Sequence, residues 1–542
     1  MSITRIIGGT LTKTATGNIE LHATNGSINI SAATHNNWHG EENGIIYHDY
    51  EAPHPADTMS NRLELTLNLF FDGTANNKNN TEAREKNATA YQKKSNKKND
   101  SYENDYTNIA RAYDVTSVSN PTQKSVYIEG VGTTDLESDD ILPMGIGQSA
   151  GFWNTGIKDK VKRACELGAI KIQKAAKGKP IDKLIINVYG FSRGAATARH
   201  FLDITNISYT VKVSKEGYFF LPGDMKLLKY PENTKDKTKP RYPESFEIKS
   251  GYFGRSLINK NVFEIGEIVF NFVGLYDTVS AHGLNHNNDV KDLGLDAIKK
   301  AKMVFQLSAV DEYRENFDLT NIDSAGLKGL ELTLPGVHSD IGGSYMAGDT
   351  EHSAVFKETY FLGTRDEHYK FTPTTKKIDA FKELLVSEGW YKNHELNIEY
   401  NEDDRIAYLV GIRVLENVYD KIALNKMILV SKQFKVEYDD KKEKKKTNIS
   451  DPFIADVFQQ LTKYSQAVMA HRNKAIKEKK SVDQYITESK KINYLDYIDI
   501  KDLKKLRNRY LHWSVKADQT GLGPRYKEVL PEEKRKRQIQ NG

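Results

Sequence analysis

The sequence has few of the residues that form covalent cross-links and no long apolar segment that would anchor it in a membrane. It contains a single cysteine, Cys165, which excludes an intramolecular disulfide. No stretch approaches the roughly 18 uninterrupted apolar residues of a membrane-spanning helix, and even the apolar run 265–276 is interrupted by Glu267 and Asn271. The first residues lack the apolar segment of a secretory signal peptide. We therefore expect a chain made in the cytoplasm that, if secreted, leaves by another route.

A large excess of charge of one sign is also missing. The chain has 78 basic and 73 acidic residues, a net charge of +5 over 542 residues, so we expect no nucleic acid partner. A hydrophobic content of 38% with 28% charged residues excludes a disordered chain and predicts a globular protein. No HExxH, CxxC, EF-hand or P-loop pattern occurs, so we expect neither a metal nor a cofactor.

The first fifty residues differ from the rest. Three segments that start at Gly9, Gly17 and Gly26 share an alternating pattern of glycine, aliphatic and polar residues, which predicts three short strands. Such strands are too short to bury a core unless they stack on something. Residues 1–50 are therefore either a terminal β-hairpin or a docking segment for a β-rich partner.

Residues 60–350 predict an α/β domain. Nearly continuous apolar strands that alternate with helical patterns are typical of a parallel sheet covered on both faces. The expected strands are 65–71, 125–130, 183–189, 268–276 and 330–334. Cys165 recurs at helical spacing with apolar residues, which indicates a small core residue rather than a reactive thiol.

Two further regions surround this sheet. A β-rich insertion is expected at 207–264, and residues 351–542 predict a mostly helical cap, with the charged run 439–446 as a solvated loop. The insertion pairs Phe219 and Phe220 with several lysines, so it is either a lipid-contacting surface or a hairpin packed on the sheet.

The pattern Gly-x-Ser-x-Gly occurs twice. Around Ser192 it follows an apolar strand and precedes an alanine-rich helical segment, with Gly190 and Gly194 as the small neighbours that a nucleophile elbow requires. Ser149 has no such strand before it and is expected in a flexible loop. Ser192 is therefore the candidate nucleophile.

A serine nucleophile needs a base and an acid that orients the base, and in this fold they follow in the order serine, acid, histidine. Asp277 ends an apolar strand, and His338 lies in a glycine-rich loop after the next predicted strand. We predict that Asp277 is the acid and His338 the base. Three other residues remain open: His512 and His282 as the base, and Asp340 as the acid.

An acyl-transfer site also needs donors for the oxyanion. One is the backbone N–H of the residue after the nucleophile, here Arg193, and the other comes from an early strand-to-helix loop. The turn at Asp72 and Gly73 ends the first predicted strand and is the candidate, although an ordinary Asp-Gly turn is the alternative.

Five motifs together resemble one known family. They are FFDGTANN (70–77), EGVGT (129–133), VYGFSRGAATAR (188–199), VGLYDTV (273–279) and PGVHSDIGGSY (335–345). The set is similar to the phospholipase effectors of bacterial type VI secretion, in the first Tle subfamily. The resemblance implies an α/β-hydrolase fold and a phospholipase A that acts on membrane phospholipids through Ser192, Asp277 and His338.

The same resemblance implies how the protein is delivered and which proteins it binds. It predicts delivery by the type VI apparatus to the periplasm or membrane surface of a competing cell, and a cognate immunity protein that protects the producer. It also suggests that residues 1–50 dock on a VgrG-like spike protein. Two rivals remain: a soluble serine esterase, and a spike-associated protein whose hydrolase domain is degenerate.

Overall fold

The structure, a computed structural model, describes residues 63–93, 100–116, 119–139, 155–224, 226–234, 238, 240–280, 289–365 and 371–542. Leu63–Gly542 forms one compact unit. The three N-terminal repeats lie outside the described residues, and so do Ser149 and His282.

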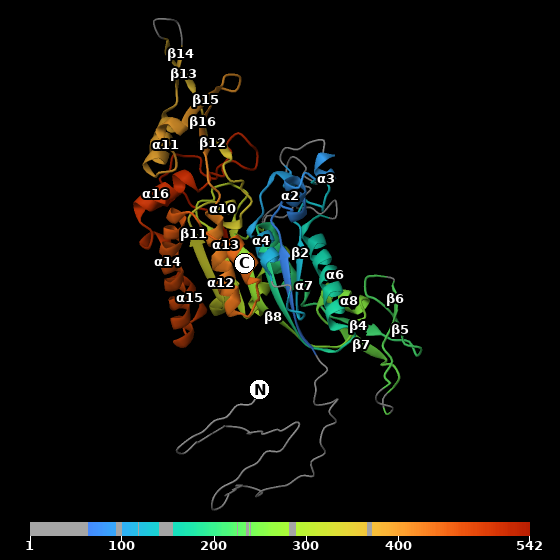
Figure 1. Cartoon of the computed structure of the whole chain (residues 1–542). Coiled ribbons are helices and arrows are strands. Elements are labelled where there is room, and N and C mark those ends of the chain that lie inside the picture. The colour runs from blue at the N-terminus through green and yellow to red at the C-terminus, as the bar shows by residue number, and fades with distance from the viewer. Residues whose placement is uncertain are drawn as a thin grey trace, which may run out of the picture. The chain divides into compact units, whose positions relative to one another are not determined.

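A six-stranded sheet forms the centre of this unit (Figure 1). Its strand order is β11-β9-β8-β3-β1-β2, and every neighbouring pair is parallel. The strands are β1 (Leu63–Phe71), β2 (Gln123–Ile128), β3 (Ile181–Phe191), β8 (Ile265–Tyr276), β9 (Met303–Ala309) and β11 (Gly329–Leu334). The predicted α/β fold with a parallel sheet is thus confirmed.

Strand β9 is absent from the strands that the sequence predicts, although all seven of its residues are buried. Gln306 and Ser308 interrupt its apolar pattern. They are satisfied inside the core, because Gln306 donates to the carbonyl of Thr320 at 3.0 Å and Ser308 shares a hydrogen bond with Thr333 at 3.1 Å. Polar residues with internal partners are compatible with a buried strand.

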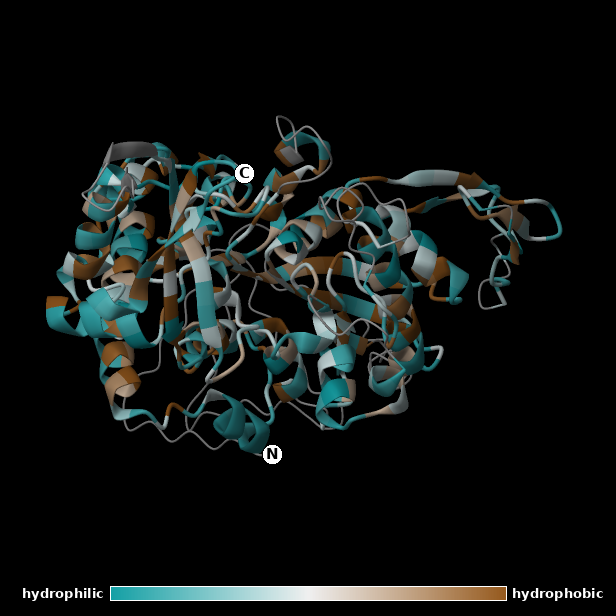
Figure 2. Ribbon diagram, turned by 90° about the horizontal axis from the view of Figure 1, so that it is seen from above, coloured by the Kyte–Doolittle hydropathy of each residue, from teal (hydrophilic) through white to brown (hydrophobic). Residues whose placement is uncertain are grey.

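Helices cover both faces of the sheet. One face carries α6 (Ile157–Ala176), α7 (Arg193–Ile204) and α8 (Gly251–Asn259), and the other carries α4 (Asn108–Val115), α12 (Asp420–Gln433) and α14 (Pro452–Lys477). Figure 2 shows apolar residues along the central strands and on the helix surfaces next to them. Cys165 is fully buried on α6, which confirms its predicted core position.

The insertion 207–264 contains two small antiparallel ladders and α8. Its strands are β4 (Tyr209–Lys212), β5 (Tyr218–Phe220), β6 (Leu227–Lys229) and β7 (Ser245–Ile248). Phe219 lies inside the insertion and packs edge-on against Phe246, whereas Phe220 on the opposite face of β5 is 60% exposed. Lipid contact, one of the two alternatives for this insertion, is therefore excluded for Phe219 and left open for Phe220, because neighbouring side chains of a strand point to opposite faces.

The C-terminal region is largely helical, as predicted, but begins with strands. A three-stranded antiparallel sheet is followed by helices that share one apolar core with the central sheet, without a break near residue 350. The strands are β12 (Thr350–Thr359), β15 (Leu396–Asn401) and β16 (Ile406–Val414), with the β13 (Phe361–Arg365) and β14 (Phe371–Thr374) pair beside them in sequence. The other helices are α11 (Lys376–Ser387), α13 (Asp440–Thr447), α15 (Val482–Ser489) and α16 (Ile500–Arg509).

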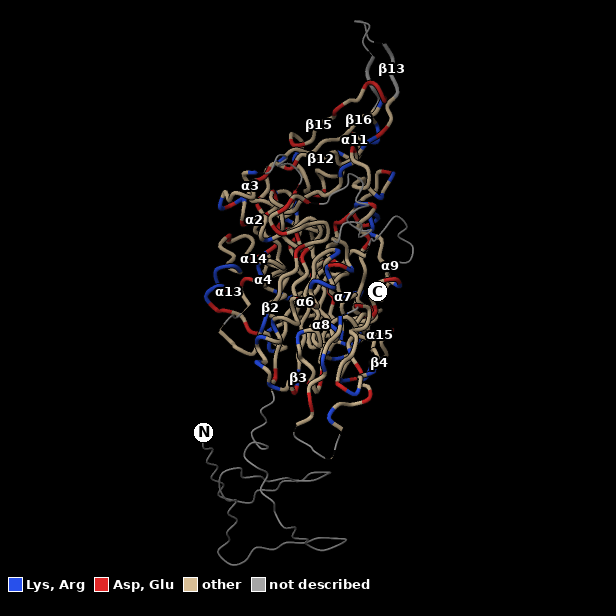
Figure 3. The backbone as a smooth tube through the Cα atoms, turned by 90° about the vertical axis from the view of Figure 1, so that its right-hand side faces the viewer, with Lys and Arg blue, Asp and Glu red and all other residues tan. Residues whose placement is uncertain are grey.

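The charged run 439–446 is helical rather than a loop. Asp439 caps α13 by accepting from the N–H of Lys442 at 3.0 Å, and three lysines occupy the last turn, where the helix dipole favours positive charge. Figure 3 shows both signs of charge interspersed over the outer elements. No described helix has the length and apolar character needed to cross a membrane.

Several shorter α-helices and strands also occur. They are α2 (Lys78–Glu85), α3 (Thr89–Gln92), α9 (Asp289–Asp292), α10 (His338–Gly342), β10 (Leu319–Thr320) and β17 (Ile539–Gln540). The last two strands pair in parallel, so the segment 537–540 runs beside the chain that follows β9.

Candidate active site

Ser192 lies on a sharp turn between β3 and α7. Its backbone has φ 57° and ψ −129°, a strained conformation for a residue with a side chain. A Cβ at Gly190 would approach the carbonyl oxygen of Gly194 to 2.4 Å, and one at Gly194 would approach that of Asp72 to 2.2 Å. Both positions therefore require glycine, which is the reason the Gly-x-Ser-x-Gly pattern accompanies this turn.

The backbone of Ser192 is bonded to the chain on both sides of Asp277. The Ser192 N–H donates to the carbonyl of Tyr276 at 3.0 Å, and the Ser192 carbonyl accepts from the N–H of Val279 at 3.3 Å. Asp277 itself, at φ 45°, directly follows β8 and is fully buried. The elbow and the acid thus meet at the carboxyl edge of the sheet, where α/β proteins build their sites.

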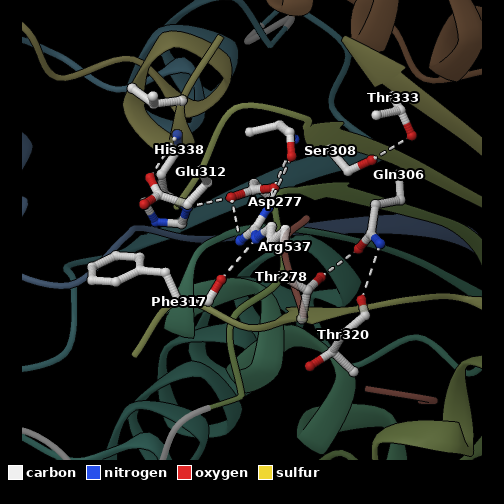
Figure 4. Close-up of polar contacts among 12 residues, drawn as sticks. Asp277, Thr278, Gln306, Ser308, Glu312, Phe317, Thr320, Thr333, His338 and Arg537 are labelled. Atoms are coloured by element: carbon white, nitrogen blue, oxygen red, sulfur yellow. Dashed lines mark hydrogen bonds and ion pairs between the residues drawn. The ribbon is translucent and has the colours of Figure 1, made fainter. Parts of the chain in front are cut away.

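Asp277 contacts His338, which opens the short helix α10. The Nδ1 of His338 lies 2.5 Å from Oδ2 of Asp277 (Figure 4). The other carboxylate oxygen accepts from the N–H of Ala309 at 2.8 Å. A bond from Nδ1 to a carboxylate leaves Nε2 of the imidazole as the proton acceptor.

Burial and charge set the protonation of this pair. Burial lowers the pKa of His338, and the neighbouring Asp277 offsets this only in part. Burial alone would raise the pKa of Asp277, but Arg537 and His338 outweigh it and hold that pKa well below its usual range. A neutral imidazole beside an ionised carboxylate is the state that a general base requires.

Two aromatic rings and a second ion pair enclose His338. Phe191 lies 4.6 Å from the imidazole and Phe317 lies 5.2 Å from it, measured between ring centroids. The backbone N–H of His338 donates to Glu312 at 3.2 Å. Burial raises the pKa of Glu312, but Arg314, with two nitrogens at 2.8 Å from its oxygens, outweighs burial and brings that pKa to about 2.

The hydroxyl of Ser192 forms no hydrogen bond with His338 within the described part of the chain. Apo enzymes often hold this contact long and close it only around substrate. Both residues are nevertheless tied to the chain around Asp277: the backbone of Ser192 bonds to Tyr276 and Val279 on either side of it, and the side chain of His338 bonds to its carboxylate.

The predicted oxyanion turn is occupied by its own hydrogen bonds. The N–H of Asp72 donates to the carbonyl of Ile128 at 2.9 Å, and the N–H of Gly73 donates to the carboxylate of Asp72 at 2.8 Å. That carboxylate also accepts from Thr107 and Tyr127, and burial raises its pKa to about 6. The hydroxyl of Thr74, by contrast, is buried and has no hydrogen-bond partner among the described residues.

His512 and Asp340 form a hydrogen-bonded pair that is separate from Asp277 and His338. Nδ1 of His512 lies 2.7 Å from Oδ1 of Asp340, and the other oxygen of Asp340 accepts from the N–H groups of Val337 and His512. Asp340 therefore ties down the loop, and the histidine it binds is His512 rather than His338.

Three residues of this site gave no signal in the sequence. Arg537 contacts Asp277, and Arg314 and Ser514 contact Glu312. None belongs to a recognisable motif, and Ser514 and Arg537 are far from their partners along the chain. No group of three or more described histidine, cysteine or acidic side chains is arranged to hold a metal ion.

Comparisons with known proteins agree with this architecture. The family described as "T6SS, Phospholipase effector Tle1-like, catalytic domain" matches residues 66–359, more than half of the chain. No curated protein sequence is significantly similar.

The solved structures that match this chain include the following two. A Tle1 effector bound to the VgrG spike of the type VI secretion system aligns with a TM-score of 0.54 at 19% identity, over 89% of this chain and 94% of that one. An uncharacterised protein from Pseudomonas aeruginosa aligns with a TM-score of 0.34 at 16% identity, over 76% of this chain and 51% of that one. The first likeness supports the same fold across nearly the whole chain. The family match shows that this chain belongs to the Tle1-like phospholipase effectors of the type VI secretion system.

Proposed function

We propose that the chain is a phospholipase A that cleaves an acyl ester of membrane phospholipids with Ser192 as the nucleophile, His338 as the base and Asp277 as its orienting acid. The observation that carries this proposal is the shared attachment at the sheet edge. The strained elbow of Ser192 is bonded through its backbone on both sides of Asp277, and the carboxylate of Asp277 lies 2.5 Å from His338.

The reaction proceeds in two halves. His338 takes the proton of the Ser192 hydroxyl while Oγ bonds to the acyl carbonyl carbon, and it then returns that proton to the departing lysophospholipid oxygen. In the second half His338 takes a proton from water, whose oxygen attacks the acyl-enzyme, and the fatty acid leaves as Ser192 regains its proton. Asp277 stays ionised throughout and stabilises the transient imidazolium.

The oxyanion of the reaction needs two hydrogen-bond donors. Arg193 opens α7, so its N–H points from the positive end of the helix dipole. Asp72 and Gly73 remain predictions for the second donor, and they require substrate to replace their present acceptors. Thr74 offers an alternative, because its buried hydroxyl has no partner to give up among the described residues.

Lipid mass spectrometry tests the activity. Phospholipid vesicles treated with wild type should yield fatty acid and lysophospholipid in equal amounts, and the acyl chain that is released gives the position cleaved. Vesicles treated with Ser192→Ala should yield neither product, with Ser344→Ala as a matched control that stays active. Equal product from wild type and Ser192→Ala would refute the nucleophile. Hydrolysis of short-chain esters without any vesicle product would instead favour the soluble esterase.

The β5–β6 hairpin supplies a surface for the membrane. Tyr218, Phe220 and Leu227 are 43%, 60% and 52% exposed, and the ammonium of Lys229 lies 5.4 Å from the Tyr218 ring. Exposed aromatics beside lysines suit an interface with anionic lipid. Phe220→Ser with Leu227→Ser should lower vesicle hydrolysis and leave a soluble ester unaffected, whereas Val414→Ser, which changes an exposed apolar residue of β16, should lower neither. Equal loss on both substrates would refute the membrane role.

We also propose that residues 1–50 load the chain on a VgrG-like spike and that a cognate immunity protein protects the producer. The solved Tle1 effector is bound to such a spike, and the repeats contain none of the proposed catalytic groups. Deletion of residues 1–45 should abolish co-purification with the spike and killing of neighbouring cells, and change soluble-ester hydrolysis by no more than about threefold, which is under about 0.7 kcal/mol. Persistent co-purification would refute the docking role.

A further inference from the structure

We propose that Arg537 is a positioning residue of the active site, which holds the carboxylate of Asp277 in place and neutralises it so that His338 stays an unprotonated base. This inference rests on the proposed function, because it concerns the same triad. Arg537 does not touch the reacting atoms, and its action passes through Asp277.

The contact between Arg537 and Asp277 is bidentate. Nη1 lies 2.6 Å from Oδ1 and Nη2 lies 3.0 Å from Oδ2 (Figure 4). Together with the bonds from Ala309 and His338, each carboxylate oxygen then accepts two hydrogen bonds. The Arg537 side chain is 6% exposed and Asp277 is fully buried, so this pair is shielded from solvent.

The segment that carries Arg537 is anchored independently of Asp277. The N–H of Leu319 donates to the carbonyl of Gln538, and the N–H of Asn321 donates to that of Gln540, each at 3.0 Å. The Nε of Arg537 itself donates to the carbonyl of Phe317 at 2.7 Å. The guanidinium and its segment are thus held by the chain at 317–321, and the guanidinium fixes the orientation of the carboxylate rather than following it.

Charged groups from three elements surround the imidazole. Asp277 follows β8, Glu312 and Arg314 follow β9, and Arg537 precedes β17. On α10 itself, Asp340 binds His512 instead. Each carboxylate near the imidazole is therefore matched by its own bidentate guanidinium: Glu312 by Arg314, and Asp277 by Arg537.

This pairing decides the protonation of His338. A buried carboxylate without a counter-charge stabilises a proton on the imidazole beside it, and an imidazolium cannot accept the proton of Ser192. Arg537 supplies the counter-charge. Burial alone would raise the pKa of Asp277, and Arg537 is foremost among the groups that hold that pKa well below its usual range, which agrees with this arrangement.

The test compares Arg537→Met with Arg537→Lys and with Arg525→Met. Arg525 lies on the same part of the chain and binds Gln538 and Asp318, but it does not touch Asp277. The readout is the pH profile of kcat/KM on a soluble short-chain ester. The acid limb of this profile is the fall of kcat/KM at low pH, where the base becomes protonated. In Arg537→Met this limb should move to higher pH by roughly one pH unit, so that activity lost at neutral pH returns in part at higher pH. Arg537→Lys should keep the wild-type limb, and so should Arg525→Met.

An acid limb of Arg537→Met that coincides with that of wild type would overturn the inference, and so would an equal loss of activity at every pH. If Arg537→Met does not fold, Arg537→Gln takes its place, because it keeps a donor without the charge and should show the same shift. The low-field proton of the His338–Asp277 hydrogen bond, followed by NMR against pH, should titrate higher in these variants. That signal needs no hydrolysis, so it tests Arg537 even if Ser192→Ala disproves the phospholipase.

Discussion

Two buried histidine–aspartate pairs meet around one loop, and their immediate geometry is nearly the same. His338 binds Asp277 at 2.5 Å, and His512 binds Asp340 at 2.7 Å, in both cases through Nδ1. His338 and Asp340 stand two residues apart on α10. Neither distance nor burial therefore tells which pair performs chemistry.

Their surroundings differ. The second oxygen of Asp340 accepts from the backbone N–H groups of Val337 and His512, so this pair joins the α10 loop to residues 511–514. The ring of His512 is stacked on Tyr345 with 3.5 Å between centroids. Asp277 instead lies at the sheet edge beside the Ser192 elbow and binds a guanidinium. The neighbours of each pair, more than the pair itself, distinguish the proposed catalytic dyad from a structural tie.

The largest expected contrast lies between the two histidines. His338→Ala should lower kcat by up to about 10⁶-fold, and adding Ser192→Ala should lower it no further, because the members of a triad act as a unit. His512→Ala should retain kcat within about tenfold, since it loses a loop contact only. Steady-state kinetics on a soluble ester measures both. A near-normal His338→Ala together with an inactive His512→Ala would reverse our assignment.

The two aspartates should differ less steeply. Asp277→Asn favours the wrong tautomer of His338 and should lower kcat by about 10⁴-fold, as the analogous change does in serine proteases. Asp340→Asn keeps an oxygen for the N–H groups of Val337 and His512 and should cost only a few-fold. Pre-steady-state kinetics of both variants, with circular dichroism to confirm folding, makes the comparison. Equal losses would mean that Asp340 also serves the reaction.

How far the sequence predicts this site follows from where its parts lie. Ser192, Asp277 and His338 each follow an apolar strand, so the strand pattern together with the elbow motif predicts that they lie at one edge of the sheet, although it leaves other histidines open as the base. Arg537 could not be found in this way, because its partner lies 260 residues earlier and the segment that carries it pairs only through β10 and β17. Strand β9 could not be predicted for a related reason. Gln306 interrupts its apolar pattern, and the sequence does not show that Gln306 has a hydrogen-bond partner inside the core.

The pH dependence of kcat/KM should also distinguish the two histidine–aspartate pairs, although by a smaller effect than the substitutions above. A base accepts a proton only when neutral, so kcat/KM should be full above the pKa of His338 and fall about tenfold per pH unit below it. Burial lowers this pKa, which places the acid limb below the ordinary value of about 6.5. His512→Gln should leave the limb where it is. If the acid limb moved in His512→Gln, the titrating base would be His512, and our assignment of His338 would be wrong.

Stability should rank the two histidines in the opposite order. His512→Ala leaves the buried carboxylate of Asp340 without its side-chain donor and opens the loop contact, which should lower the free energy of unfolding by about 2 kcal/mol. His338→Ala leaves Asp277 bonded to Arg537 and Ala309, so it should change that free energy by less than about 1 kcal/mol. Urea unfolding of both variants at neutral pH measures the difference. If His338→Ala were the more destabilising of the two, His338 would hold the loop, and the role of structural tie would not be confined to His512.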